Sequence, residues 1–137
     1  MMVMDEETRL GFSKDHQGLY RDLTEKSSSP FYKKHYADVF IFAIALAIKE
    51  DLAPTTVRNR LANIPFSAIG KRDWILNAVA IAEKKDHKIL SDQKEVLDQC
   101  EKYASSGISL LYKEVFQKEG DFYKRMESYC RTILKAQ

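Results

Sequence analysis

The pattern of hydrophobic and polar positions centres on one apolar run, residues 39–48, in which ten successive side chains are non-polar. A helix that is apolar on every face must be surrounded by other elements. Ten residues rise only about 15 Å as a helix, which is about half the thickness of a bilayer core. We therefore predict a buried central helix over residues 34–51, ended by Pro54, and not a membrane span.

Helical spacing of apolar positions predicts amphipathic helices around this central helix. They are expected over residues 13–26, 74–84, 91–104, 108–118 and from 121 onward. Their expected N-terminal caps are Ser13, Asp73, Ser91 and Asp121. The small residues 105–107 are expected to kink or end the helix that contains them. Trp74 is expected on an apolar face, and the last helix is expected to bury Phe122, Met126, Tyr129, Cys130, Ile133 and Leu134.

Two short stretches, residues 8–12 and 55–61, have weak extended patterns, and the second could equally form one or two helical turns. Residues 1–7 are expected to be disordered. The combined pattern predicts an all-α fold: a compact single domain over residues 1–137, with five or six helices around the central helix. A short N-terminal extended segment is compatible with this prediction.

The net charge of +2 is small, but its distribution is uneven. Residues 31–72 carry seven basic and three acidic side chains, whereas the rest of the chain has no basic excess. The N-terminal stretch is too short and too acidic for a signal peptide. Cys100 and Cys130 lie in core register and are expected to be reduced thiols, so we expect a cytoplasmic protein.

No grouping of residues indicates catalysis. His16, His35 and His87 have neither the mutual spacing nor the neighbouring carboxylates of a metal site. The two cysteines have no nearby base in the sequence, and there is no glycine-rich phosphate loop. We therefore predict a protein that is not an enzyme and that needs no cofactor or metal.

Basic residues in loops and at helix ends are the candidate nucleic-acid-binding residues, namely Lys33, Lys34, Arg58, Arg60, Lys71 and Arg72. Such positions leave backbone N–H groups near a bound phosphate, while lysine and arginine supply the charge. Tyr32, Tyr36 and Trp74 flank these residues. The alternative interpretation is an ordinary solvated surface with no nucleic-acid contact.

Two other arrangements stay open at this point. A segment at 8–12 followed by helices over 13–26 and 34–51 has the order of a ribbon-helix-helix DNA-binding regulator, in which Thr8 and Arg9 would read bases. Gly11, the long loop and residues 73–137 do not fit that fold. Alternatively, the chain is a helical adaptor or homodimer without nucleic-acid contact, which docks through the apolar face of the last helix.

Three stretches resemble a known family: residues 30–47, 64–66 and 100–111. They carry an aromatic-led Lys-x-x-Tyr-Ala-Asp-Val-Phe-Ile-Phe-Ala segment, then Ile-Pro-Phe, then Tyr-Ala-Ser-Ser-Gly-Ile-Ser-Leu-Leu. This pattern resembles small prokaryotic proteins encoded beside DNA phosphorothioation (Dnd) modification and restriction systems. The resemblance implies an accessory or regulatory role, with DNA or another protein of that system as the partner, and assigns no catalytic residue.

Overall fold

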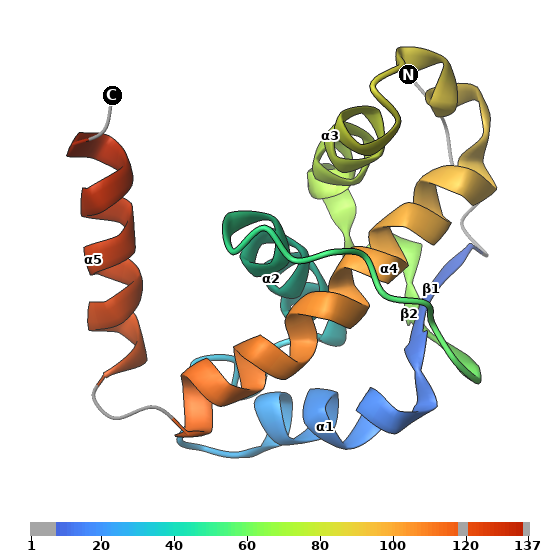
Figure 1. Ribbon diagram of the computed structural model, residues 1–137. Coiled ribbons are helices and arrows are strands. Elements are labelled where there is room, and N and C mark those ends of the chain that lie inside the picture. Colours follow the sequence, from blue (N-terminus) through green and yellow to red (C-terminus); the bar gives the residue numbers. More distant parts are fainter. Residues whose placement is uncertain (1–7, 118–120, 136–137) are drawn as a thin grey trace.

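The computed structural model describes residues 8–117 and 121–135, and these form a mostly helical molecule with one small antiparallel sheet (Figure 1). The helices are α1 (Gln17–Glu25), α2 (Tyr36–Lys49), α3 (Asp73–Lys84), α4 (Gln93–Tyr112) and α5 (Phe122–Lys135). The strands are β1 (Arg9–Ser13) and β2 (Arg60–Pro65). The all-α prediction is therefore wrong in part. The predicted disorder of residues 1–7 lies outside the described residues.

Short helical turns connect these elements. They are η1 (Lys14–His16), η2 (Phe66–Ala68), η3 (Gly70–Arg72), η4 (His87–Ser91) and the π-helical turn η5 (Lys113–Gln117). Within the described ranges, no helix is both long enough and apolar enough to cross a membrane.

The predicted N-terminal extended segment is confirmed as β1, and it pairs with β2 of the same chain. Leu10 lies opposite Ile64, and Ser13 lies opposite Arg60. Leu10 and Ile64 are both fully buried, so the two-stranded sheet contributes to the core. A ribbon-helix-helix protein would instead pair its N-terminal strand with that of a second chain. The observed pairing within one chain does not support that alternative.

Ser13 does not cap the first helix as predicted. Its hydroxyl oxygen accepts a hydrogen bond from the backbone N–H of Arg58, at 2.9 Å. The segment after Ser13 starts with η1, and α1 begins only at Gln17. The side chain is therefore used to hold the loop before β2 against the end of β1.

The predicted central helix is confirmed as α2, and most of its side chains are buried. His35 and Asp38 form a capping box at its start, in which the His35 N–H donates to the Asp38 carboxylate at 2.9 Å. Its end is not set by Pro54. Asp51 adopts a left-handed conformation with φ of 55°, and the Leu52 N–H donates to Ala47 O at 2.8 Å, which is a Schellman ending.

α4 is one continuous helix where two were expected, and it crosses α2 closely (Figure 1). The reason is Gly107: a Cβ atom there would collide with the carbonyl group of Ala43 on α2. The glycine therefore permits backbone contact between the two core helices and does not end a helix. Asp92, not Ser91, caps α4 by accepting from the Glu95 N–H at 3.1 Å.

The faces of α3 and α5 also differ from the prediction. Trp74 is 62% exposed, because α3 buries Leu76 and Ala80 instead. On α5, Phe122 is buried against the rings of Phe31 and Phe42, whereas Cys130 and Leu134 are exposed. In Figure 1, α5 stands to one side of the other helices. Its apolar stripe is thus only partly covered.

Candidate functional site

The best-supported candidate site is a group of basic residues where the chain enters α2 and α3. We call Lys33, Lys34, Lys71 and Arg72 the α2 N-terminal cluster. The two lysines before α2 follow the loop that Pro30 ends, and Lys33 has a left-handed backbone with φ of 63°. Its N–H donates to Thr24 O at 2.9 Å, which holds that conformation in place.

Arg72 is the fixed member of the cluster. Its Nη1 donates to Asp38 Oδ1 at 2.8 Å, while Nη2 and Nε donate to Ala68 O and Ile69 O at 3.0 and 3.1 Å. Burial alone would raise the pKa of Asp38, but the hydrogen bond from His35 and the Arg72 guanidinium together hold that pKa below its usual value. A charged Asp38 therefore ties η3 to the start of α2.

A surface cavity lies beside Lys34 of the cluster. The cavity measures about 450 Å³, and Lys34 and Ala68 both line it. Because Arg72 bonds to the carbonyl of the same Ala68, Lys34 and Arg72 lie at one edge of the molecule. Lys33 and Lys71 are their exposed chain neighbours. The structure thus places four of the six predicted residues on the two turns that the Arg72–Asp38 ion pair joins.

The other two predicted residues, Arg58 and Arg60, lie at the opposite end of β2. Arg60 pairs with Ser13 at the start of the strand, whereas Pro65 lies at the end near the cluster. Five residue steps of a strand span about 17 Å. The structure therefore separates the six residues into two groups.

Arg60 has a structural role that sequence reasoning missed. Its Nε and Nη2 donate to the two carboxylate oxygens of Glu101 at 2.7 and 2.9 Å. The Glu101 side chain is only 3% exposed and also accepts from the Gly11 N–H at 3.2 Å. This ion pair joins the two-stranded sheet to α4, and no sequence pattern connects residues so far apart. A phosphate contact by Arg60 stays a prediction.

Two exposed aromatic side chains accompany the α2 N-terminal cluster. Trp74 follows Arg72 by two residues, and Tyr32 is 41% exposed beside Lys33, whose Nζ lies 5.4 Å from the centre of its ring. In the sequence, both aromatic residues stand within two positions of a basic residue of the cluster.

The chemistry of the cysteines and histidines indicates no reaction centre in the described part of the chain. Burial raises the pKa of the Cys100 thiol to about 12, so it stays protonated, and the thiol donates to Leu76 O. Burial also lowers the pKa of His16, although the neighbouring Asp15 carboxylate opposes that shift. Over residues 8–117 and 121–135, no three histidine, cysteine or acidic side chains are grouped as metal ligands.

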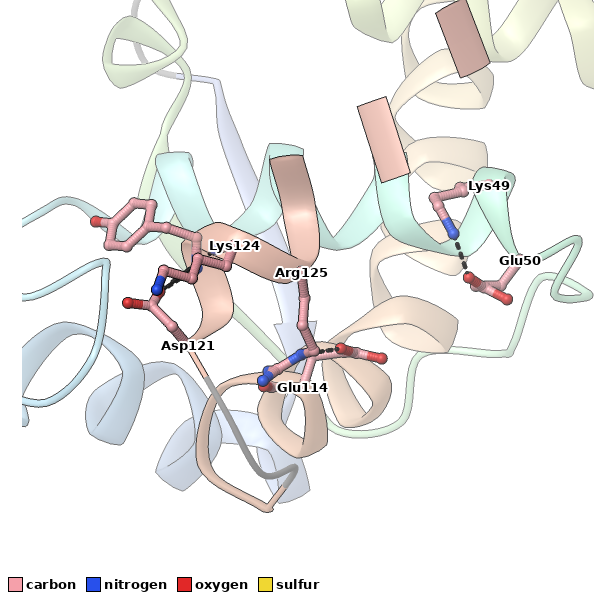
Figure 2. A network of polar contacts seen from close by, with 7 residues as sticks. Lys49, Glu50, Glu114, Asp121, Lys124 and Arg125 are labelled. Atoms are coloured by element: carbon pink, nitrogen blue, oxygen red, sulfur yellow. Dashed lines mark hydrogen bonds and ion pairs between the residues drawn. The ribbon is translucent and has the colours of Figure 1, made fainter. Parts of the chain in front are cut away.

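Polar contacts at the base of α5 form a second notable group (Figure 2). Arg125 Nε lies 3.3 Å from Glu114 Oε2, and Asp121 Oδ1 caps α5 by accepting from the Tyr123 N–H at 2.8 Å. Farther along, Lys49 Nζ lies 3.9 Å from the centre of the Tyr129 ring. These contacts hold α5 mainly through its first turns and one cation–π contact.

The fold and the site define a small, mostly helical protein with a basic edge. Residues 9–133 match the family described as DNA sulphur modification system-associated protein 4. The chain belongs to this family, which confirms the resemblance to Dnd-associated proteins and supports an accessory role in such a system. No curated protein and no solved structure matches the chain.

Proposed function

We propose that this chain is a non-enzymatic accessory protein of a DNA sulphur modification system and that it contacts DNA phosphates through the α2 N-terminal cluster. The observation that carries the proposal is the Arg72–Asp38 ion pair, at 2.8 Å, because it draws the basic turns before α2 and α3 together. The family supplies the DNA context, and the cluster supplies a surface that suits phosphate.

The charges at this edge favour an anionic partner. Lys33, Lys34 and Lys71 are exposed, while Arg72 is partly exposed and held in a fixed position by its three acceptors. Only the acidic side chains of Asp38 and Asp73 lie on the same turns. Such contacts position a protein on DNA without reading its sequence, so we propose binding to the backbone with little sequence preference.

The test is a fluorescence-anisotropy titration of a labelled duplex at several salt concentrations. If four phosphates are contacted, the slope of log affinity against log salt is expected near −3.6, since each contact contributes about −0.9. The double variant Lys33→Gln/Lys34→Gln removes two of these contacts, so the magnitude of the slope should fall by about 1.8. The variant should also weaken binding to every duplex alike.

The matched control is Lys88→Gln/Lys94→Gln, which removes the same charge from exposed positions on η4 and α4. This control should leave the salt slope unchanged if the cluster is the site. The proposal fails if the wild-type protein has no affinity for duplex at low salt, or if both double variants weaken binding equally.

A second candidate function is self-association through α5, and the exposure of its apolar side chains favours it. Leu134 is 68% exposed and Tyr123 is 65% exposed, and Cys130 is exposed on the same helix. An amphipathic helix with an uncovered apolar stripe is typical of a surface that binds another helix. Sedimentation analysis of the wild type and of Leu134→Glu tests it: a dimer lost in the variant supports it, and a wild-type monomer at high concentration refutes it.

A further inference from the structure

A second cavity, distinct from the basic cluster, lies where the end of β1, α4 and the segment before β2 meet. It measures about 380 Å³, which is within the range of small-molecule pockets. The segment that forms its rim is held at two points. The Thr55 N–H donates to Lys102 O at 3.1 Å, and the Lys14 N–H donates to Arg58 O at 3.2 Å. We call this the β1–α4 cavity.

The lining of the β1–α4 cavity has unused hydrogen-bonding capacity. Four buried side-chain polar atoms in the described residues have no hydrogen-bond partner, and two of them belong to residues of this lining: Ser105 Oγ and His16 Nδ1. Ser105 is only 6% exposed. Buried polar groups in folded proteins are nearly always paired, so an unpaired group at a cavity indicates a missing partner.

The remaining groups of the β1–α4 cavity suit an oxyanion. Arg58 contributes an exposed guanidinium group and Thr56 contributes a hydroxyl group, whereas the Thr55 hydroxyl is already bonded to Ser106 Oγ at 2.8 Å. Asp15 is the one carboxylate among these lining residues, and its side chain is exposed. Donors therefore outnumber acceptors, and arginine with hydroxyl groups is the usual set that binds a tetrahedral oxyanion.

We propose that the β1–α4 cavity binds a small molecule that carries a phosphate or sulfate group. Arg58 pairs with the oxyanion, and Ser105 and His16 donate the hydrogen bonds that no protein group accepts. The ligand can be a free phosphorylated or sulfated compound or a phosphate of the DNA backbone, because both present the same chemistry. This site is independent of the α2 N-terminal cluster.

The test is an NMR titration of the ¹⁵N-labelled full chain with inorganic phosphate and with sulfate, against chloride at equal ionic strength. Shifts of amide signals are expected to be confined to residues 13–16, 55–58 and the neighbourhood of Ser105. Arg58→Gln and Ser105→Ala should each weaken phosphate binding by about tenfold or more, as expected for loss of a hydrogen bond to a charged group. Lys94→Gln, which lies outside the cavity, should leave binding unchanged.

Ser105→Ala is a suitable probe because it removes only a buried hydroxyl that has no partner, and the variant should fold as the wild type does. The proposal is overturned if phosphate causes no localised shifts, or if the shifts persist equally in both cavity variants. A short duplex that displaces inorganic phosphate from the cavity supports the proposal and identifies DNA as the source. Localised phosphate binding that duplex does not displace supports it and identifies a free small molecule.

Discussion

At the scale of single residues, the ion pair between Arg60 and Glu101 links β2 to α4. The carboxylate is almost fully buried, and its two oxygens are satisfied by the guanidinium of Arg60 and the N–H of Gly11. A buried charge is tolerated only while its partners are in place. Loss of one partner is therefore expected to destabilise the protein much more than replacement of both partners by apolar side chains.

Removing one partner of this pair should be costly. Arg60→Met is expected to lower the free energy of unfolding by about 3 kcal/mol, because Glu101 would be left buried and unpaired while Arg60 itself is partly exposed. The double variant Arg60→Met/Glu101→Met should recover most of that loss. Urea denaturation of the three proteins measures the difference, and a double variant no more stable than Arg60→Met would contradict this account.

Asp38 predicts a dependence of stability on pH. Its pKa in the folded protein lies below the ordinary value of 3.8, so the charged form stabilises the fold above that value. The contribution is lost as pH falls through the lowered pKa. Asp38→Asn should lower the free energy of unfolding by about 1 kcal/mol at neutral pH, because the helix cap and the ion pair are lost. The difference in the free energy of unfolding between variant and wild type should become smaller in acid. Thermal denaturation at a series of pH values measures it; a gap that does not change with pH would refute the assignment.

Trp74 offers an internal reporter, since it is the only tryptophan in the chain and is largely exposed beside Arg72. If duplex DNA binds at the α2 N-terminal cluster, its fluorescence should be quenched or shifted to shorter wavelength during the titration, because the indole leaves bulk water. The Lys33→Gln/Lys34→Gln variant should show a weaker response. Binding seen by anisotropy with unchanged tryptophan emission would place the DNA on another surface.

At the scale of elements, the crossing of α2 and α4 organises the fold. Both helices bury long apolar stripes, and Gly107 lets their backbones approach where any side chain would strike Ala43. A short run of small residues within an apolar pattern can either end a helix or allow close packing. The pattern along one chain does not distinguish these outcomes, because the second helix supplies the constraint. That is why residues 105–107 were misassigned.

Two identical substitutions should therefore have opposite effects. Gly107→Ala is expected to destabilise the protein by about 3 kcal/mol, because the added methyl group forces α2 and α4 apart. Gly18→Ala should stabilise it by about 0.5 to 1 kcal/mol, since its nearest neighbour is the flexible tip of Arg21 at 3.7 Å and helices favour alanine. Chemical denaturation of both variants measures this contrast, and effects of the same sign would contradict the crossing model of Gly107.

At the scale of the whole molecule, the basic excess of the middle third does not form one continuous face. Four of its seven basic side chains lie on the turns before α2 and α3, and Lys49 lies at the end of α2. Arg58 and Arg60 lie at the other end of β2, where Arg60 is bound to Glu101. α5 adds a separate, partly uncovered apolar surface (Figure 1). The molecule thus presents a basic edge, a polar cavity and an apolar helix face at different places.

The sequence by itself determined the central helix, the extended N-terminal segment and the cap of α5 at Asp121, because apolar spacing and capping residues act within a few residues of chain. The prediction that Asp73 caps α3 is wrong: Asp73 is the first residue of that helix, and Arg72 occupies the N-cap position without a side-chain cap. Only the tertiary structure decided that β1 pairs with β2, that Gly107 is a crossing point, and that Arg72 meets Asp38 while Arg60 meets Glu101. Those outcomes depend on which distant groups approach each other during packing. Burial and pairing are properties of the assembled neighbours, so no local pattern encodes them.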